Sequence, residues 1–406
     1  MPNTLLTISM ITREAARVLV NELGFGKRVN RQYDNKFAQS GAKIGYSLNV
    51  RKPPRYITSS GATLVVNDST ETQATVTLSQ EHVGLEFTAA DMALSIDDFS
   101  KRFIKPAVSA LANKIDFDGT LLYRDVYNLA NTVGAGNPTQ LSQYLAAKKF
   151  LTQGGTPQSD RVMCINSAQT VAIIDALKGL FNSTGRVADQ YEKGAMSGGP
   201  VAGFDWYEDE NMRLHTFGTW GPVGNVLVVA GGQTGSTLSI DGLTATTGTC
   251  LRGDVFTLAG VYMVNPQNRQ STGELQRFVV TSNKTASGGG AITDLPISPP
   301  ITVSGKDQTV TASPADNAPV TIQATAVSAE GHQGLAFHPD AFTLATADME
   351  IPKGVDFADR VSSPELGISL SVIRQYDIRE GSYPCRIDSL YGWSTLRPEL
   401  ACRISN

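Results

Sequence analysis

The longest helical pattern in the chain runs from Ser95 to Asn131. Its apolar residues recur at steps of three, four and seven, which places them in one stripe of an α-helix. Ser95 and Asp98 resemble a capping box at its start, and Pro106 predicts a kink or a break. At about 1.5 Å per residue, a continuous helix would span roughly 50 Å and serve as a spine for other elements. The stripe consists of Phe99, Phe103, Ala107, Leu111, Ile115, Leu122, Val126 and Leu129.

The first forty residues predict an arm and not part of a core. Thr12–Leu23 has helical spacing and ends at Gly24, a common residue after a helix. The residues that follow, GFGKRVNRQYDNKFAQSG, are basic and rich in turn formers. We therefore expect 1–41 to form an N-terminal arm.

From Ala42 the hydrophobic period becomes two, which indicates β-strands. Arg51–Arg55 (RKPPR) interrupts the first strand pattern, and further strand signals follow at 62–66 and 72–79. These strands hold few large apolar residues, so they would bury little by themselves. We expect an extended two-stranded finger over 42–88 that is stabilised by lying on another surface.

Beyond the long helix, the pattern alternates between helix and strand. It predicts helices over Thr139–Leu151 and Ser167–Leu180, with a buried strand over Arg161–Ile165 between them. This alternation is typical of a modest α/β portion. We assign the long helix and this portion to one region, 89–222.

The following hundred residues are dominated by short strand signals and turns. Between Asn225 and Thr325 we expect a small β-sandwich or barrel, with loops at Ser287–Gly290 and Pro296–Pro300. Because mixed structure resumes after it, the β region over 223–334 is interpreted as an insertion, and 335–406 as the return of the chain. The predicted fold class is α+β with an inserted all-β domain.

Composition narrows the possible functions. A hydrophobic content of 41% with 18% charged residues is ordinary for a soluble globular protein. The net charge of −4 argues against a sequence-independent grip on nucleic-acid phosphates. The four cysteines lack metal-site spacing, and no apolar run is long enough to cross a bilayer. Since no secretion signal is evident, we expect reduced thiols in a cytoplasmic setting, and no metal, cofactor or membrane partner.

One motif suggests catalysis. Asp116 and Asp118 belong to DFDGTL, which resembles the D-x-D-G-T-[LV] nucleophile motif of haloacid-dehalogenase-type phosphatases. That resemblance implies nucleophilic attack by Asp116, acid–base work by Asp118 and a nearby magnesium ion. The chemistry requires the pair to follow a buried strand, whereas the preceding residues have helical spacing. We therefore interpret them as two solvated acids in a helix, with Gly119 as a local weak point.

Three stretches in the second half of the chain carry a family resemblance. They are DVFTLAGVYMVNPQNRQSTGELQRFVVTS at 254–282, GLAFHPDAFTLATADMEIPKG at 334–354 and PCRIDSLYGWSTLRPELACRI at 384–404. With the order of elements above, they make the chain resemble the major capsid proteins of tailed double-stranded DNA bacteriophages. Within these it is similar to short-tailed phage coat proteins that carry a telokin-like insertion domain. In order and proportion, the resemblance covers nearly the whole chain.

The resemblance implies a structural protein with no catalytic or cofactor site. Its segments would be an N-terminal arm (1–41), an extended finger loop (42–88), a peripheral domain with the spine helix and the first part of the axial domain (89–222), the insertion domain (223–334), and a return to the axial and peripheral domains (335–406). Pentamers and hexamers would form an icosahedral virion capsid, assembled in the host bacterial cytoplasm. The shell would enclose double-stranded DNA without sequence-specific binding. A portal protein and a separate scaffolding protein are the other implied partners, since no fused scaffolding segment precedes the arm.

The same resemblance suggests which charges make contacts between subunits. At the finger, we expect Arg51, Lys52 and Arg55 to pair with acids of a neighbouring subunit. Further expected contacts are Arg13 and Arg17 in the arm and Asp241 and Asp254 in the insertion domain.

Three alternatives remain open from the sequence. An encapsulin-like compartment shell of the same fold would be favoured by a neighbouring cargo-enzyme gene. A magnesium-dependent phosphatase that uses Asp116 and Asp118 would hydrolyse a generic phosphate ester. A β-rich phage tail or adhesin component fits poorly with the long helix.

Overall fold

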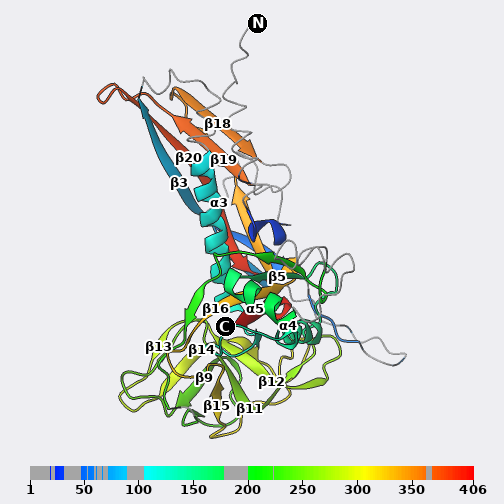
Figure 1. Cartoon of the computed structure of the whole chain (residues 1–406). Coiled ribbons are helices and arrows are strands. Elements are labelled where there is room, and N and C mark those ends of the chain that lie inside the picture. Colours follow the sequence, from blue (N-terminus) through cyan, green and yellow to red (C-terminus); the bar gives the residue numbers. More distant parts are fainter. Residues whose placement is uncertain are drawn as a thin grey trace. The chain divides into compact units, whose positions relative to one another are not determined.

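The computed structural model divides the chain into two compact units (Figure 1). Unit 1 consists of 1–52, 73–120 and 342–396, and unit 2 consists of 53–72, 121–341 and 397–406. Each unit therefore combines segments that are far apart in the sequence. The structure describes residues 19, 23–31, 47–52, 54–58, 61, 66, 72–88, 105–177, 200–222, 224–362 and 368–406.

Unit 1 is built on an antiparallel sheet around β20 (Ser382–Thr395). The first part of β20 lies between β3 (Ser79–Thr88) and β19 (Ser369–Arg374), and its last part pairs with β17 (Phe342–Ala347). A further strand, β18 (Phe357–Ser362), pairs with β19 at the edge of the sheet. This strand-rich arrangement is visible in Figure 1.

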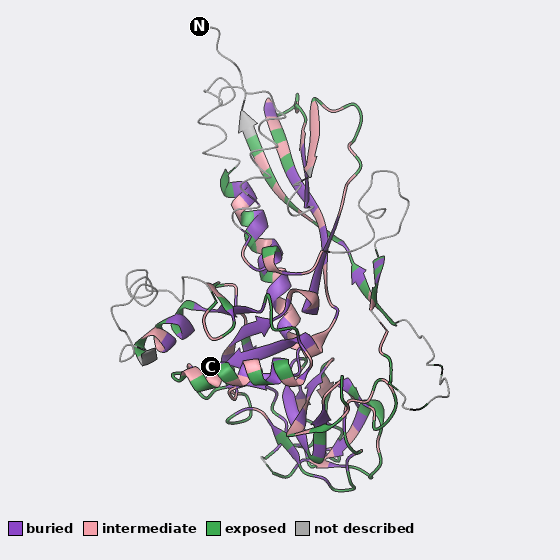
Figure 2. Cartoon of the chain, turned by 90° about the vertical axis from the view of Figure 1, so that its right-hand side faces the viewer, coloured by how far each residue is buried: buried purple, intermediate pink, exposed green. Residues whose placement is uncertain are grey.

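Helix α3 (Lys105–Thr120) packs along β3 and β20, and Figure 2 shows its buried positions. Ala107, Leu111 and Ile115 of the predicted stripe are buried, so this part of the predicted helix is confirmed. Pro106 is the second residue of the helix in the part of the chain that the structure describes. The predicted stretch 95–104 lies outside the described residues.

The predicted continuation of the helix to Asn131 is wrong. The chain forms the 3₁₀-helix η4 (Leu121–Asp125) and then the short strand β4 (Leu129–Ala130). β4 pairs in parallel with β21 (Ala401–Ser405), so sheet pairing with the far end of the chain overrides the local helical spacing. Leu129 is buried because it belongs to a strand and not because it lies on a helix stripe.

Two strands of the predicted finger form a separate small sheet. β1 (Ser47–Lys52) pairs with β2 (Thr72–Thr77), and their apolar side chains pack with residues of β17 and of the chain after β20. β3 is part of the large sheet of unit 1 and pairs with β20. The contacting side chains are Leu48, Val50, Val76, Leu78, Ala345 and Leu396.

Unit 2 contains a mixed sheet with two helices. The strand order is β4, β21, β16 (Glu330–Phe337), β5 (Val162–Ile165) and β6 (Asp205–Glu208), and β7 (Leu214–Thr216) also pairs with β16. Helices α4 (Leu141–Gln153) and α5 (Ser167–Leu177) confirm the predicted helices around β5. Two 3₁₀-helices lie in the segment 335–406: η6 (Pro339–Ala341) directly precedes β17 in the sequence, and η7 (Pro398–Leu400) follows β20.

The strands expected between Asn225 and Thr325 form a β-rich part of unit 2. Its six-stranded sheet has the order β15 (Val320–Ile322), β11 (Val255–Val264), β12 (Ser271–Val280), β14 (Ile292–Ile301), β9 (Gly235–Asp241) and β8 (Leu227–Val228). A second pair joins β10 (Thr249–Cys250) to β13 (Lys284–Thr285).

The loop predicted at Pro296–Pro300 is wrong, because these residues belong to β14. Leu295, Ile297 and Ile301 are buried in the core of the β region. Their period of two supports a strand, although prolines cannot donate to a β ladder. Burial of alternate side chains therefore outweighs the local turn signal of the prolines.

The core of the β region includes residues that precede it in the sequence. Tyr127, Leu129 and Val133 are buried in the same cluster as the strands of the insertion. Phe217 and Trp220 join them, and Trp220 lies 5.4 Å from Phe256, measured between ring centroids. The hydrophobic core is thus continuous across the predicted boundary at residue 223.

Candidate functional site

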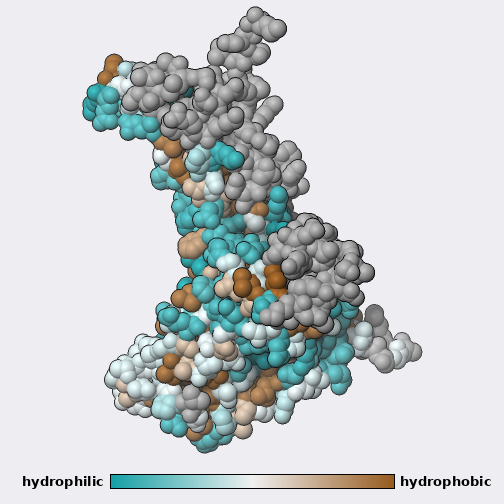
Figure 3. All heavy atoms as spheres, in the orientation of Figure 1, coloured by the Kyte–Doolittle hydropathy of each residue, from teal (hydrophilic) through white to brown (hydrophobic). Residues whose placement is uncertain are grey.

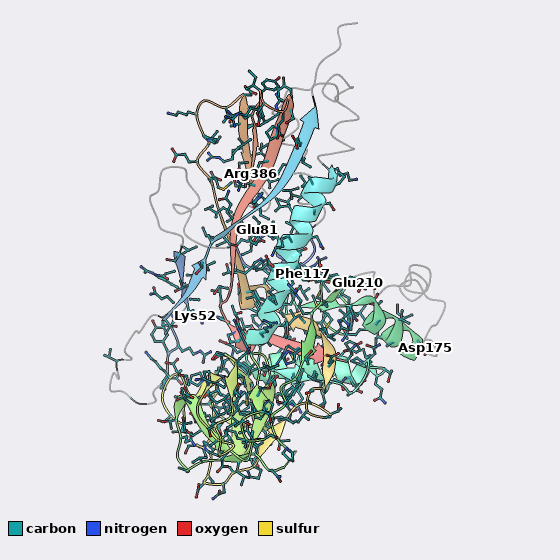
Figure 4. The ribbon with its side chains drawn as sticks, turned by 90° about the vertical axis from the view of Figure 1, so that its left-hand side faces the viewer. Lys52, Glu81, Phe117, Asp175, Glu210 and Arg386 are labelled. Carbon is teal, nitrogen blue, oxygen red and sulfur yellow. The ribbon has the colours of Figure 1, made fainter. Side chains whose placement is uncertain are left out.

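The predicted contact charges of the finger lie at and just after the end of β1. Figure 4 labels Lys52, the last residue of that strand, and Arg51 precedes it. Arg55 already has a partner in its own chain, because its Nη2 donates to Glu399 Oε1 at 2.7 Å. Both side chains of this pair keep some exposure, as is usual for a surface ion pair. Contacts of the three basic residues with a neighbouring subunit stay a prediction.

The other predicted contact charges differ in their surroundings. Asp241 is the last residue of β9, where it is half-buried and lies opposite Leu227. Arg13 and Arg17 lie outside the described residues. Their roles between subunits also stay predictions.

Asp254 occupies a buried position within unit 2. Its carboxylate accepts hydrogen bonds from His215 Nε2 at 3.1 Å, Trp220 Nε1 at 2.7 Å and the backbone N–H groups of Gly218 and Leu251 at 3.1 and 2.9 Å. The side chain is fully buried. An internal role therefore replaces the expected contact with another subunit, since all four donors belong to the same chain.

His215 extends this network to η4. Its Nδ1 lies 3.1 Å from the hydroxyl of Tyr123, and its Nε2 faces the Asp254 carboxylate. Because a carboxylate only accepts, Nε2 carries the proton and Nδ1 accepts from the Tyr123 hydroxyl. Burial lowers the pKa of His215, and the nearby cations Arg124 and Arg403 act in the same direction. We call Tyr123, His215, Trp220 and Asp254 the Asp254 network.

The surroundings of His215 predict a loss of stability in acid. Its folded-state pKa lies below the ordinary value of 6.5, so below that pH the unfolded chain binds the proton more readily. The stabilisation from the neutral ring is complete above pH 6.5 and declines as the pH falls from there through the folded-state pKa. Urea unfolding between pH 5 and 8 should show a smaller acid-side loss for His215→Gln than for the wild type.

An exposed histidine provides the control for this pH dependence. His82 lies on β3 with its side chain exposed, so His82→Gln removes a histidine that is not part of the Asp254 network. If His215→Gln loses as much stability in acid as the wild type, groups other than His215 are responsible for that loss.

Asp116 lies on the buried side of α3 and holds a segment of the N-terminal region. Its carboxylate accepts hydrogen bonds from the backbone N–H groups of Gly24, Phe25 and Gly26 at 2.6, 3.2 and 2.8 Å. These groups lead into the 3₁₀-helix η1 (Gly26–Arg28), so Asp116 satisfies the donors at its start. The interpretation of Asp116 as a solvated acid is wrong, because the residue is only 3% exposed.

Asp118 is occupied by two different partners. Lys114 Nζ donates to it at 2.6 Å, and the Tyr391 hydroxyl donates to it at 2.8 Å. Burial raises the pKa of Tyr391, so its hydroxyl keeps the proton that it donates. Because both acids lie within a helix and not after a strand, the arrangement lacks the geometry of the phosphatase motif.

Gly119 allows close packing between α3 and β20. A Cβ atom at this position would lie 2.6 Å from Trp393 Cζ2 and 2.9 Å from Phe25 Cδ1. The indole Nε1 of Trp393 donates to the Ile115 carbonyl at 3.1 Å, which fixes the ring against the helix. The glycine is therefore required for space, and its weak helix propensity is secondary.

The sequence held a usable signal for the burial of Asp116 but not for that of Asp254. Asp116 follows Val108 and Ala112 at steps of four, so a wider helix stripe would have placed it on the buried face. Asp254 has no such signal, because three of its four donors lie 34 to 39 residues away.

The described ranges contain neither a cluster of metal-ligand residues nor a helix that could span a membrane. Within them, no group of three or more His, Cys, Asp and Glu residues could hold a metal ion. None of the helices described is long and apolar enough to cross a membrane.

Comparison with known proteins identifies one matching family. A family model described as "P22 coat protein - gene protein 5" matches residues 19–403. No curated protein sequence matches the chain.

Similar solved structures are phage capsids at low identity. The capsid of Ralstonia phage GP4 has a TM-score of 0.45 at 8% identity, with 94% of this chain and 88% of that chain covered. A solved structure of Mycobacterium phage Che8 matches with a TM-score of 0.43 at 12% identity, and the match covers 94% of this chain and 90% of that chain. The capsid of Cyanophage P-SCSP1u has a TM-score of 0.43 at 12% identity, with 93% and 88% covered. Because these scores are low, the functional assignment rests on the family match alone.

Proposed function

The chain belongs to the P22 coat protein family, and we propose that it builds an icosahedral shell around double-stranded DNA with the help of a separate scaffolding protein. It is a structural phage coat protein that forms the virion capsid, and not an enzyme. The single observation that carries this conclusion is a family match over nearly the whole chain. We therefore prefer this function to the three alternatives: an encapsulin-like shell, a phosphatase and a tail component.

The proposed division of labour follows the segments predicted from the sequence. The arm (1–41) and the finger (42–88) would contact neighbouring subunits, and 89–222 and 335–406 would supply the peripheral and axial domains. The insertion (223–334) would assist folding and size control. The six-stranded sheet within 227–322 gives most of this segment a β architecture.

The net charge of the chain and the physics of assembly from many weak contacts are compatible with the proposed partners. A net charge of −4 would limit trapping of packed DNA on the inner wall of the shell. Many weak contacts per subunit allow errors to be corrected during assembly, while their sum stabilises the closed shell. We propose that the scaffolding protein guides this process in the host cytoplasm and that a portal protein is a further partner of the shell.

Electron microscopy of the chain, expressed with its scaffolding protein, tests the proposal. We expect closed, uniform icosahedral shells in negative stain. Soluble monomers or small oligomers, in the presence of folded scaffolding protein, would contradict it. Expression without the scaffolding protein serves as the comparison and should give fewer or misshapen shells.

Replacing Arg51, Lys52 and Arg55 together by alanine should lower the yield of shells without unfolding the subunit. The Arg55–Glu399 pair within the chain is partly exposed, so its loss should cost about 1 kcal/mol or less. Shell yield is measured by sedimentation, and subunit stability by urea unfolding.

Arg252→Ala is the matched control for this triple variant. It removes a comparable internal pair, in which Arg252 Nη2 lies 2.7 Å from Asp125 Oδ1 and both side chains are partly exposed. Normal shell yield from the triple variant, or an equal loss from Arg252→Ala, would remove the idea that the finger charges contact other subunits.

A further inference from the structure

The turn between β19 and β20 is held in one conformation by its own hydrogen bonds. Asp377 N donates to Ser382 O at 2.9 Å, and Gly381 N donates to Asp377 O at 2.9 Å. Arg379 N donates to the Asp377 carboxylate at 2.8 Å, which closes a second, tighter turn. Gly381 has a φ of +65°, a conformation that favours glycine. We call residues 375–384 the hairpin tip.

Aromatic contacts brace the hairpin tip. The rings of Tyr376 and Tyr383 lie 4.9 Å apart between centroids, and the Arg374 guanidinium lies 5.4 Å from the Tyr383 ring. Tyr376 N also donates to the Asp356 carboxylate at 2.6 Å, which joins the tip to the chain before β18. Little conformational freedom would be lost when such a tip binds a partner.

Of the large apolar side chains in this ordered turn, Ile378 is the most exposed, and Tyr376 is 42% exposed. Ile378 is 84% exposed, and the charged neighbours Arg379 and Glu380 are also exposed. Figure 3 shows a small hydrophobic spot among hydrophilic spheres at the end of this hairpin. Single exposed apolar residues are common. Here, however, Ile378 lies at the end of a turn held by hydrogen bonds and aromatic contacts, and it is followed by a basic and an acidic residue, Arg379 and Glu380.

A shallow groove lies on the same sheet. It has a volume of about 480 Å³ and is lined by parts of β3, β19, β20 and the hairpin tip. Leu85, Ile373 and Pro384 supply apolar surface, and Glu86 and Arg386 supply charge of both signs. Figure 4 labels Arg386 on β20, and Glu86 lies on the neighbouring strand β3, opposite Pro384.

We propose that Ile378 of one copy seats in this groove of a second copy of the chain. Arg379 then faces Glu86, and Glu380 faces Arg386. The inference rests on the proposed shell function, which brings many copies together. A second copy is the occupant because one patch of unit 1 carries the apolar knob, the apolar groove and a matching set of opposite charges, as a contact between identical surfaces requires.

The second charge pair is compatible with the internal contact of Arg386. Its Nε donates to the buried Asp388 carboxylate at 2.6 Å, which fixes the guanidinium on β20. An arginine has five N–H donors in a planar fork, so one carboxylate does not saturate it. Substituting Arg386 would disturb Asp388, and the test therefore uses the Arg379–Glu86 pair.

Ile378→Asp should reduce the yield of shells at least tenfold, whereas Ile378→Val should assemble like the wild type. Both substitutions lie at an exposed position, so the midpoint of urea unfolding should stay unchanged. Yield is measured by sedimentation of subunits assembled with scaffolding protein. Equal yields from Ile378→Asp and the wild type would overturn the contact.

A charge reversal tests the identity of the occupant. Arg379→Glu should reduce shell yield, and the double variant with Glu86→Arg should restore it. Failure of the second substitution to restore yield would overturn the proposed pairing. Loss of scaffolding binding by Ile378→Asp, in co-sedimentation with purified scaffolding protein, would instead identify that protein as the occupant and overturn the contact between copies. A wild-type chain that forms no shells would overturn the shell function itself, so the two failures are distinguishable.

Discussion

Asp254→Ala is expected to lower the free energy of unfolding of unit 2 by about 3–5 kcal/mol. The substitution leaves the N–H donors of His215, Trp220, Gly218 and Leu251 without their common acceptor. It also removes a negative charge close to the buried cation Arg403, whose pKa is lowered by burial to about 10 and which therefore stays charged at neutral pH. Urea unfolding followed by circular dichroism measures the loss.

Asp241→Ala is the control for this prediction. Asp241 is also an aspartate of the β region, but it is half-buried at the end of β9, so its loss should cost about 1 kcal/mol or less. Asp254→Asn keeps the size of the side chain and places an amide among donors, and it should fall between the two alanine variants. Similar unfolding midpoints for Asp254→Ala and Asp241→Ala would show that the Asp254 network contributes little.

Gly119→Ala is expected to destabilise unit 1 by about 1–3 kcal/mol, in spite of the better helix propensity of alanine. The new methyl group would lie 2.6 Å from the Trp393 ring and 2.9 Å from Phe25, well inside contact distance. Relief requires a shift of α3 or of the indole, and the latter would weaken its hydrogen bond to the Ile115 carbonyl. The unfolding midpoint of the variant tests this expectation.

A second substitution separates steric conflict from a general effect. Trp393→Phe shortens the facing ring and should be destabilising alone, but Gly119→Ala should cost less in that background than in the wild type. The difference is the coupling energy of the pair. If Gly119→Ala stabilises the wild-type chain, as helix propensity alone predicts, the close packing does not constrain this position.

The elements that the sequence predicts correctly are those whose burial follows from neighbouring residues. Helices α4 and α5 show helical spacing of apolar residues over a short range, β5 is a short apolar run, and the structure places all three as expected. Leu129 misled the helix prediction, because its partner Arg403 lies in the last strand of the chain. Prolines misled the prediction at 296–300, because the strand β14 is specified by the buried residues around them.

The surroundings of some charged residues can also be inferred from neighbouring residues, whereas those of others depend on the folded chain. The exposed Arg51 could be recognised as a contact candidate from its place at the end of a strand pattern. Asp116 and Asp254 looked like exposed acids, but each binds donors that only the folded chain brings near. A buried carboxylate and a solvated one look alike in a sequence unless the residues around it reveal the buried face.

The shared core of unit 2 also sets the smallest piece that related chains could exchange by recombination. A crossover that moved only 223–334 would leave Tyr127, Val133, Phe217 and Trp220 behind, although all four are buried with the β strands. It would also separate Trp220 from Asp254, which its indole binds at 2.7 Å. A functional hybrid would have to carry the two flanking segments with the insertion. The segment that must be exchanged as a whole is therefore longer than the segment that forms the β-sheet.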